Sequence, residues 1–193
     1  MPPATVVLDR DDIRRTLVRI AHEIVEKNPP EAGERPSVAL VGIHRRGAIL
    51  ARRLHALTSE LLDTTVPIGD VDISFYRDDL AIRVGGPGSP VVHSSHLEFP
   101  LDGLTVVIVD DVLYTGRTVR SAIDAIFDYG RPAKVQLAVL VDRGHRELPI
   151  RPDYVGKNIP TAQDQRVYVH VDEVDGRDEV TIVPATEPRR AAA

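Results

Sequence analysis

The sequence predicts an α/β fold with a central, mainly parallel sheet flanked by helices. The stretch 106–109 holds four β-branched residues in a row, without the polar alternation of a half-exposed strand, which is typical of a strand buried on both faces. A second apolar run, 37–43, has the same character, and helical patterns follow both runs after short polar loops. Strand, loop and helix in repeated succession indicate parallel strands whose carboxyl ends open on one rim of the sheet.

Length and composition are those of one soluble globular domain. The 193 residues are 42% hydrophobic and 27% charged, which excludes a disordered chain. No apolar run is long enough to span a membrane, and no leading segment resembles a targeting signal, so we expect a cytoplasmic protein. Without cysteine there is no disulfide or thiolate chemistry. The net charge of −5 means that any contact with RNA must use a local basic patch.

The first element is an amphipathic helix over 10–27, with Asp9 as its N-cap. Its apolar positions recur at helical spacing, at Ile13, Leu17, Ile20 and Ile24. Arg15, Arg19 and His22 share another stripe of the helix. A solvated face is the simpler interpretation of that stripe, and a binding face is the alternative.

The second strand, 37–43, ends in a basic loop that is followed by a helix over 47–61. The loop consists of His44, Arg45, Arg46 and Gly47. Cations at the end of a strand indicate either exposure to solvent or a bound anion. Gly42 and Gly47 flank the loop and allow its backbone to approach a ligand closely, which favours the anion.

A third strand, 68–76, leads into a segment with a tip rich in Gly and Pro at 85–90 and a returning strand over 91–99. This pattern predicts a flexible β-arm over about 76–98. Such an arm beside an active site acts as a lid, and an idle hairpin is the alternative. The base of the predicted lid is Tyr76, Arg77, Asp78 and Asp79.

The stretch around which the chain is organised joins the central strand to a helix through a polar turn. It comprises Val107, Ile108, Val109, Asp110, Asp111, Val112, Leu113, Tyr114, Thr115, Gly116, Arg117 and Thr118. The Thr-Gly-Arg-Thr turn stands where the N–H groups of a helix start bind a phosphate. The two aspartates suit sugar hydroxyls or a metal ion. Together these groups predict a site for a ribose 5-phosphate.

The remainder of the chain predicts a fourth core strand and a small β-rich hood. The strand covers 134–141, and short strands near 154–159, 166–174 and 179–183 follow it. We expect one domain over 1–193, with a core at about 5–143, the hood at about 142–183 and a disordered tail at 184–193.

The apolar run, the Asp-Asp pair and the Thr-Gly-Arg-Thr turn resemble the phosphoribosyl pyrophosphate (PRPP) motif of the type I phosphoribosyltransferases, and the predicted fold is theirs. Further segments, at 76–80, 141–150 and 155–160, are similar to those of a bacterial group within this family. Members of that group join uracil phosphoribosyltransferase activity to regulation of pyrimidine biosynthesis (pyr) mRNA. The likeness spans about residues 5–185. One departure is His44-Arg45-Arg46, where relatives often have Lys-Thr-Arg.

The resemblance implies the reaction uracil plus PRPP giving UMP plus diphosphate, with Mg²⁺ bound alongside PRPP. It assigns the ribose and, through water and PRPP, the metal to Asp110 and Asp111, with Arg77 of the lid as a further catalytic candidate. The basic loop at 44–47 takes the diphosphate, in relatives often through a non-proline cis peptide. Arg143 and Val167 in the hood receive uracil or the nucleotide. No residue is an obvious general base.

The resemblance also implies binding to the pyr mRNA leader in response to the uridine nucleotides UMP and UTP, and a homodimer or larger assembly. The candidate RNA-binding residues are Arg15, Arg19, His22, Arg146 and Arg151. Two alternatives stay open: a phosphoribosyltransferase for another base without RNA regulation, and a nucleotide-sensing regulator with little activity. A dinucleotide-binding oxidoreductase is disfavoured, because no Gly-x-Gly-x-x-Gly turn follows a strand.

Overall fold

The computed structural model describes residues 4–30, 36–73 and 95–184. In chain order the elements of these residues are β1 (Thr5–Leu8), α1 (Arg10–Lys27), β2 (Val38–Ile43), α2 (Arg46–Leu62), β3 (Ile68–Val71), β4 (Thr105–Leu113), α3 (Arg117–Tyr129), β5 (Lys134–Asp142), β6 (Tyr154–Asn158), β7 (Arg166–His170), α4 (Asp172–Asp175) and β8 (Glu179–Val183). None of the helices in this part of the chain has the length and apolar character needed to cross a membrane.

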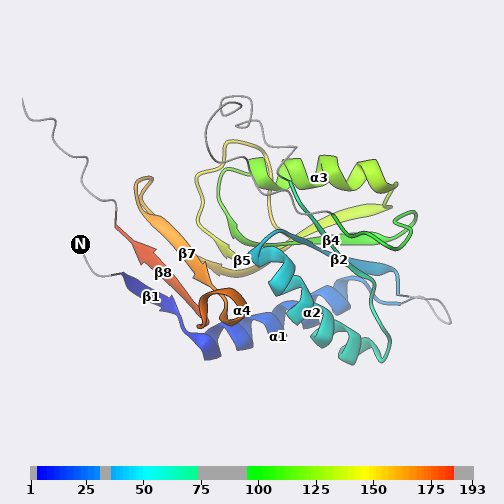
Figure 1. Ribbon diagram of the computed structural model, residues 1–193, viewed down its shortest axis with the longest axis horizontal. Coiled ribbons are helices and arrows are strands. Elements are labelled where there is room, and N and C mark those ends of the chain that lie inside the picture. Colours follow the sequence, from blue (N-terminus) through cyan, green and yellow to red (C-terminus); the bar gives the residue numbers. More distant parts are fainter. Residues whose placement is uncertain (1–3, 31–35, 74–94, 185–193) are drawn as a thin grey trace, which may run out of the picture.

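The core is a five-stranded sheet in the order β3-β2-β4-β5-β6, and every neighbouring pair is parallel (Figure 1). The predicted parallel sheet is therefore confirmed, with β4 at its centre. Val106, Val107, Ile108 and Val109 are all buried, as their unbroken apolar run indicates. Because β2 and β4 are hydrogen-bonded neighbours, the two polar loops that follow them emerge side by side.

Alternate residues of the core strands point into two separate apolar layers. Leu40, Val107 and Val109 pack with the buried faces of α1 and α2, whereas Val41 and Ile108 pack with the buried face of α3. Figure 1 shows the same division, with α3 on one face of the sheet and α1 and α2 on the other. This doubly covered sheet places both polar loops at its rim, where parallel sheets bind ligands.

The hood differs from the prediction in two strands. It is an antiparallel sheet in the order β1-β8-β7, and it takes one strand, β1, from the start of the chain. The strand predicted near 154–159 is β6, which belongs to the core sheet beside β5. Val155 of β6 is partly buried and packs in the core. The segment therefore makes its backbone hydrogen bonds and buries its apolar side chain in the core sheet.

The predicted helices at 10–27 and 47–61 are confirmed as α1 and α2. Asp9 caps α1 as predicted, and its carboxylate accepts a hydrogen bond of 2.8 Å from the N–H of Asp12. At the root of the predicted arm, Asp70 of β3 pairs with His96 in an antiparallel bridge. The predicted lid base, from Tyr76 to Asp79, lies outside the described residues, as does the predicted tail from 185 onward.

Candidate active site

The PRPP-like stretch forms the end of β4, a turn and the first turn of α3. Gly116 has a φ of 92°, a left-handed value that favours glycine, and it precedes the first residue of α3, Arg117. The first N–H groups of a helix have no partner within the helix. Those of α3 therefore open toward the polar turn, as an anion site requires.

A cavity of about 430 Å³ lies at this junction. Its lining is supplied by Asp110, Val112, Leu113, Tyr114, Thr115, Gly116, Arg117, Thr118, Val119 and Ser121. The cavity thus runs from Asp110 to the start of α3. A carboxylate at one end and helix N–H groups with threonine hydroxyls at the other match the two ends of a sugar phosphate.

Burial of Asp110 and Asp111 next to each other is electrostatically unfavourable for their ionised forms. Burial raises the pKa of Asp110 well above its usual range, and the negative charge of Asp111 raises it further. Burial also raises the pKa of Asp111, against the lowering effects of the Val112 N–H and of Arg46. A buried pair of like charges is electrostatically unfavourable, so Asp110 and Asp111 are residues that could hold a cation.

The basic loop after β2 packs directly on β4. A Cβ added at Gly47 would lie 2.4 Å from the carbonyl oxygen of Val109 and 3.2 Å from the Cα of Asp110. Only a residue without a side chain allows this approach. The peptide bond between His44 and Arg45 is cis, as the resemblance implied. The structure therefore brings together the acidic pair, the polar turn and the basic loop.

The cations of the loop have partners that the sequence did not reveal. The Nε2 atom of His44 lies 2.5 Å from Oδ1 of Asp70 in β3. Arg46 donates a hydrogen bond of 2.8 Å to Oδ1 of Asp175 in α4. Arg45 is exposed and makes no ion pair with another described residue. Arg45 is thus the loop cation that is most available for an incoming anion.

The predicted base-binding residue Arg143 is buried between the core and the hood. Its guanidinium lies 4.1 Å from the ring centroid of Tyr114 and donates a hydrogen bond of 2.7 Å to the carbonyl of Gln165. Val167 follows two residues later in β7 and is partly buried. Arg143 therefore joins the strand that precedes the hood to the aromatic residue of the PRPP-like turn.

Arg146, predicted as an RNA contact, is engaged in internal hydrogen bonds. It bonds to the carbonyls of Ile150 and Tyr114 at 3.0 and 2.8 Å and to the carboxylate of Asp142 at 2.5 Å. These bonds tie the loop after β5 to the turn after β4. Arg146 therefore positions the site, and its guanidinium is largely engaged inside the protein.

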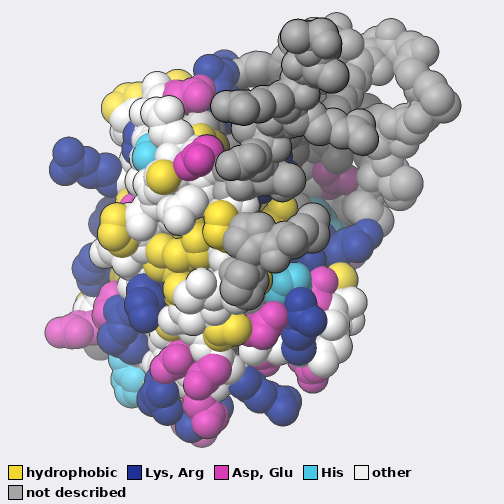
Figure 2. Space-filling view, turned by 90° about the vertical axis from the view of Figure 1, so that its left-hand side faces the viewer, with side chains coloured by type: hydrophobic (Ala, Val, Ile, Leu, Met, Phe, Trp, Pro, Cys, Tyr) yellow, Lys and Arg dark blue, Asp and Glu magenta, His cyan; other side chains and the backbone are white. Residues whose placement is uncertain are grey.

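The other candidate RNA contacts lie on α1 and just before β6. Arg15, His22 and Arg151 are exposed. Arg19 is exposed as well, and it also donates hydrogen bonds of 2.9 and 2.7 Å to the carbonyls of Val155 and Gly156, which fastens α1 to the edge of the sheet. On the side of the molecule that carries the hood, Lys and Arg are interspersed with Asp and Glu (Figure 2).

Sequence reasoning missed two acidic residues, Asp70 and Asp175, that neutralise the basic loop. Arg46 and Asp175 are 129 positions apart, and no periodicity or motif links them. The only sequence signal for Asp70 was its position in the short alternating segment that forms β3, Ile68–Val71. Both partners depend on the tertiary fold.

We expect Asp175→Asn to lower the free energy of unfolding by about 1–2 kcal/mol at neutral pH, since a hydrogen bond to a charged group is lost. Burial opposes ionisation of Asp175, but hydrogen bonds from the Val171 N–H and from Arg46 outweigh it and lower its pKa. A lowered carboxyl pKa stabilises the fold above the ordinary value near 3.8, and the stabilisation is lost as the pH falls through the folded-state pKa. The loss of unfolding free energy caused by Asp175→Asn should therefore become smaller as the pH falls.

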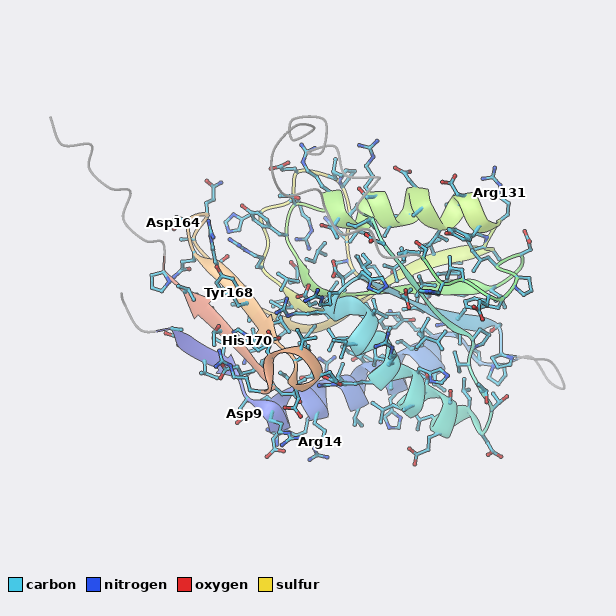
Figure 3. The ribbon with its side chains drawn as sticks, in the orientation of Figure 1. Asp9, Arg14, Arg131, Asp164, Tyr168 and His170 are labelled. Carbon is cyan, nitrogen blue, oxygen red and sulfur yellow. The ribbon has the colours of Figure 1, made fainter. Side chains whose placement is uncertain are left out.

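Chemical denaturation at pH 7 and at about pH 3.5, in the range where carboxyls titrate, measures this effect. Asp164→Asn is the matched control, because Asp164 is exposed in the turn before β7 (Figure 3). A deficit of equal size at both pH values would mean that the charge of Asp175 is not what holds the basic loop to α4.

Comparison with known proteins agrees with the site. The model of the phosphoribosyl transferase domain family matches residues 7–173. A "Bifunctional protein PyrR" of Roseiflexus sp. (strain RS-1) is 60% identical over 181 residues, which are 93% of this chain and 95% of that protein. A "Bifunctional protein PyrR" of Listeria monocytogenes serotype 4b (strain CLIP80459) is 50% identical over 187 residues, 97% of this chain and 100% of that protein.

Solved structures support the fold alone, because their sequences are distant. The hypoxanthine phosphoribosyltransferase of Trypanosoma cruzi in complex with IMP superposes with a TM-score of 0.67 at 19% identity and covers 93% of this chain and 89% of that one. A hypoxanthine phosphoribosyltransferase of Staphylococcus aureus gives 0.64 at 20% identity, with 95% and 93% covered. On its sequence, its fold and the arrangement of its loops, the chain belongs to the phosphoribosyltransferase family, among the bifunctional PyrR proteins.

Proposed function

We propose that the protein transfers the phosphoribosyl group of PRPP to uracil, giving UMP and diphosphate, and that it regulates pyr mRNA in response to uridine nucleotides. The observation that carries the proposal is the meeting of the acidic pair, the Thr-Gly-Arg-Thr turn and the basic loop at one rim of the sheet. The relatives at 50–60% identity are named bifunctional PyrR proteins. Their names support both halves of the proposal.

In this proposal each segment binds one part of PRPP. The first turn of α3, with Thr115 and Thr118, binds the 5-phosphate, and Asp110 and Asp111 face the ribose hydroxyls. Arg45 and the backbone of the loop at 44–47 bind the diphosphate. Displacement at the anomeric carbon leaves positive charge on the ribose and negative charge on the diphosphate. The site therefore works by placement and charge stabilisation, and it needs no nucleophile of its own.

The acidic pair fits a Mg²⁺ ion bound together with PRPP. Carboxylate oxygens are hard ligands of the kind that Mg²⁺ prefers, and burial beside Asp111 raises the pKa of Asp110, a cost that a bound cation would offset. Asp110 and Asp111 would hold the ion through water and through PRPP. When bound, Mg²⁺ supplies charge neutralisation for the diphosphate.

The base lies against the hood in this proposal. Arg143 and the backbone near Val167 would receive uracil. The Arg143 guanidinium lies 4.1 Å from the ring centroid of Tyr114, a residue that lines the cavity, and this contact limits how the guanidinium can turn. Arg77 belongs to the predicted lid, and we propose that it adds positive charge when the lid closes over PRPP.

Turnover with a panel of bases tests the enzyme half of the proposal. The protein is incubated with PRPP and Mg²⁺ and with uracil, hypoxanthine, guanine or orotate in turn, and nucleotide formation is measured. We expect UMP from uracil and at least tenfold slower turnover of the others. Preference for a purine or for orotate would assign the site to another base, and no turnover of any base would favour a nucleotide sensor.

For regulation, we propose that exposed cations around α1 and the start of β6 contact the pyr mRNA leader. The exposed candidates of the predicted set are Arg15, Arg19, His22 and Arg151. Regulation of mRNA implies a cytoplasmic protein. A homodimer or larger assembly would double the surface, and sedimentation would establish its size. UMP bound at the active site would favour the RNA-binding form through linkage.

We expect Arg151→Glu to weaken binding of a leader RNA while uracil turnover stays unchanged. Loss of one phosphate contact should reduce the slope of log affinity against log salt by about 0.7–1. Filter binding at several salt concentrations measures both quantities. Arg131→Glu is the matched charge reversal, since Arg131 lies at the far end of α3 (Figure 3). Equal RNA affinity of the two variants would remove Arg151 from the surface.

A further inference from the structure

A cluster of three side chains with potential metal-ligand atoms lies beside the active site. The proposed reaction uses the backbone of the loop that contains His44, but it assigns no role to these three side chains. His44, Asp70 and His96 each offer one ligand atom, and these atoms all lie within 4.8 Å of one another. Oδ1 of Asp70 is 2.5 Å from Nε2 of His44 and 3.3 Å from Nδ1 of His96. One carboxylate oxygen is therefore flanked by two imidazoles.

Backbone hydrogen bonds between neighbouring segments hold His44, Asp70 and His96 next to one another. The N–H of His44 donates to the carbonyl of Val71 at 3.0 Å, immediately after the parallel pairing of β2 with β3. Asp70 and His96 exchange two backbone hydrogen bonds, of 3.0 and 2.9 Å. The ligand set is thus assembled by the strands before any ion is bound, which lowers the cost of binding.

We propose that His44, Asp70 and His96 form a site for one transition-metal ion of the zinc class. Two imidazole nitrogens and one carboxylate oxygen are the ligands that Zn²⁺ takes in open three-residue sites, and imidazole also suits Co²⁺ and Ni²⁺. Mg²⁺ prefers oxygen ligands in an octahedral arrangement, so this site is distinct from the one assigned to Asp110 and Asp111.

The three ligand atoms lie within 4.8 Å of one another, and a tetrahedral ion would require them to be evenly spaced around it. With metal–ligand distances of about 2.0–2.1 Å, neighbouring ligand atoms are about 3.3–3.5 Å apart. The Asp70–His96 distance of 3.3 Å already meets this value. The Asp70–His44 distance of 2.5 Å must widen by about 1 Å, which rotation of the partly exposed side chains supplies.

The cluster is reachable from solvent. His96 is 57% exposed, and a cavity of about 390 Å³ beside it is lined by Asp70 and His96 together with Arg52, His55 and Glu98. An ion can enter from this cavity and keep a water molecule in its fourth position, as open zinc sites do. The competing arrangement is a hydrogen-bonded His-Asp-His triad that binds no ion.

Metal titration of the full-length protein separates these two arrangements. Zn²⁺ is titrated by calorimetry and Co²⁺ by visible absorption, in the presence of excess Mg²⁺ so that the acidic pair does not compete. The variants are His96→Ala and Asp70→Asn, and the control is His22→Ala, which removes an exposed histidine on α1. Circular dichroism establishes that each variant is folded.

We expect saturation at one ion per chain for the wild type and the control, with the intense visible band of a four-coordinate Co²⁺. Each variant should bind at least tenfold more weakly, because one of three ligands is gone. A wild type that takes up no ion, or variants that bind as the wild type does, would overturn the proposal. Because no step of this test uses PRPP or uracil, its outcome is independent of the proposed function.

Discussion

Asp110→Asn should slow uracil phosphoribosyl transfer by about 10²–10³-fold and at the same time raise the melting temperature. The carboxylate is buried, and its pKa is raised by that burial and by Asp111. Its charge therefore destabilises the fold that holds it. An amide of the same shape removes the charge while keeping the volume of the side chain. A gain of about 1 kcal/mol in unfolding free energy corresponds to about 2–4 °C for a chain of this size.

The direction of the Asp110 pKa shift determines how the stability gain of Asp110→Asn depends on pH. Because the pKa of Asp110 is higher in the folded chain than in the unfolded chain, the folded form binds the proton more tightly. The cost to stability is absent well below the ordinary carboxyl pKa, grows as the pH rises, and is complete above the folded-state pKa. The advantage of Asp110→Asn should therefore increase from acid to neutral pH.

Thermal melts from about pH 4 to pH 8, together with steady-state turnover, measure both effects. Asp164→Asn, at an exposed position in the turn before β7, controls for a general effect of removing one negative charge. A variant that melts below the wild type at neutral pH would mean that Asp110 stabilises the fold, contrary to the electrostatic description of the site.

Gly47→Ala should be a severely damaging single-methyl change at the contact between the basic loop and β4. The added Cβ would lie 2.4 Å from the carbonyl oxygen of Val109, which is backbone of the central strand and cannot move aside. Overpacking of this kind costs about 1–3 kcal/mol. Because the basic loop would be pushed away from Asp110, the KM for PRPP should also rise, by about tenfold or more.

Gly103→Ala is the appropriate control. Gly103 has a φ of 78° but no atom within 4 Å of an added Cβ, so its substitution carries a backbone penalty of about 1–2 kcal/mol without a steric clash. Its KM for PRPP should match that of the wild type. If Gly47→Ala also left the KM unchanged, the contact between the basic loop and β4 would have no part in PRPP binding.

Local sequence signals were sufficient for the core of the fold. The run at 106–109 predicted a strand covered on both faces, and β4 is central with all four residues buried. The Asp9 cap and the apolar spacing predicted α1, and the structure confirms both. These features depend on residues that are neighbours in sequence, where periodicity and capping are decisive.

Contacts between distant segments could not be predicted. Strand β6 was assigned to the hood, but its pairing with β5 places it in the core sheet. Arg19 and Arg146 were predicted as RNA contacts, and the sequence did not show that their guanidinium groups also bond to backbone carbonyls of other segments, although Arg19 stays exposed. A sequence shows that a side chain is charged, but its partner depends on the assembled fold. The acidic partners of the basic loop, Asp70 and Asp175, were missed for the same reason.

Calorimetric titration of PRPP with Mg²⁺, repeated in the presence of saturating UMP, tests most directly whether the three segments form one site. We expect one PRPP per chain in the first titration. In the second we expect competition, since the 5-phosphate of UMP would occupy the same turn at the start of α3. Failure to bind PRPP, or binding of PRPP and UMP to the chain at the same time, would contradict the single site on which the proposed function depends.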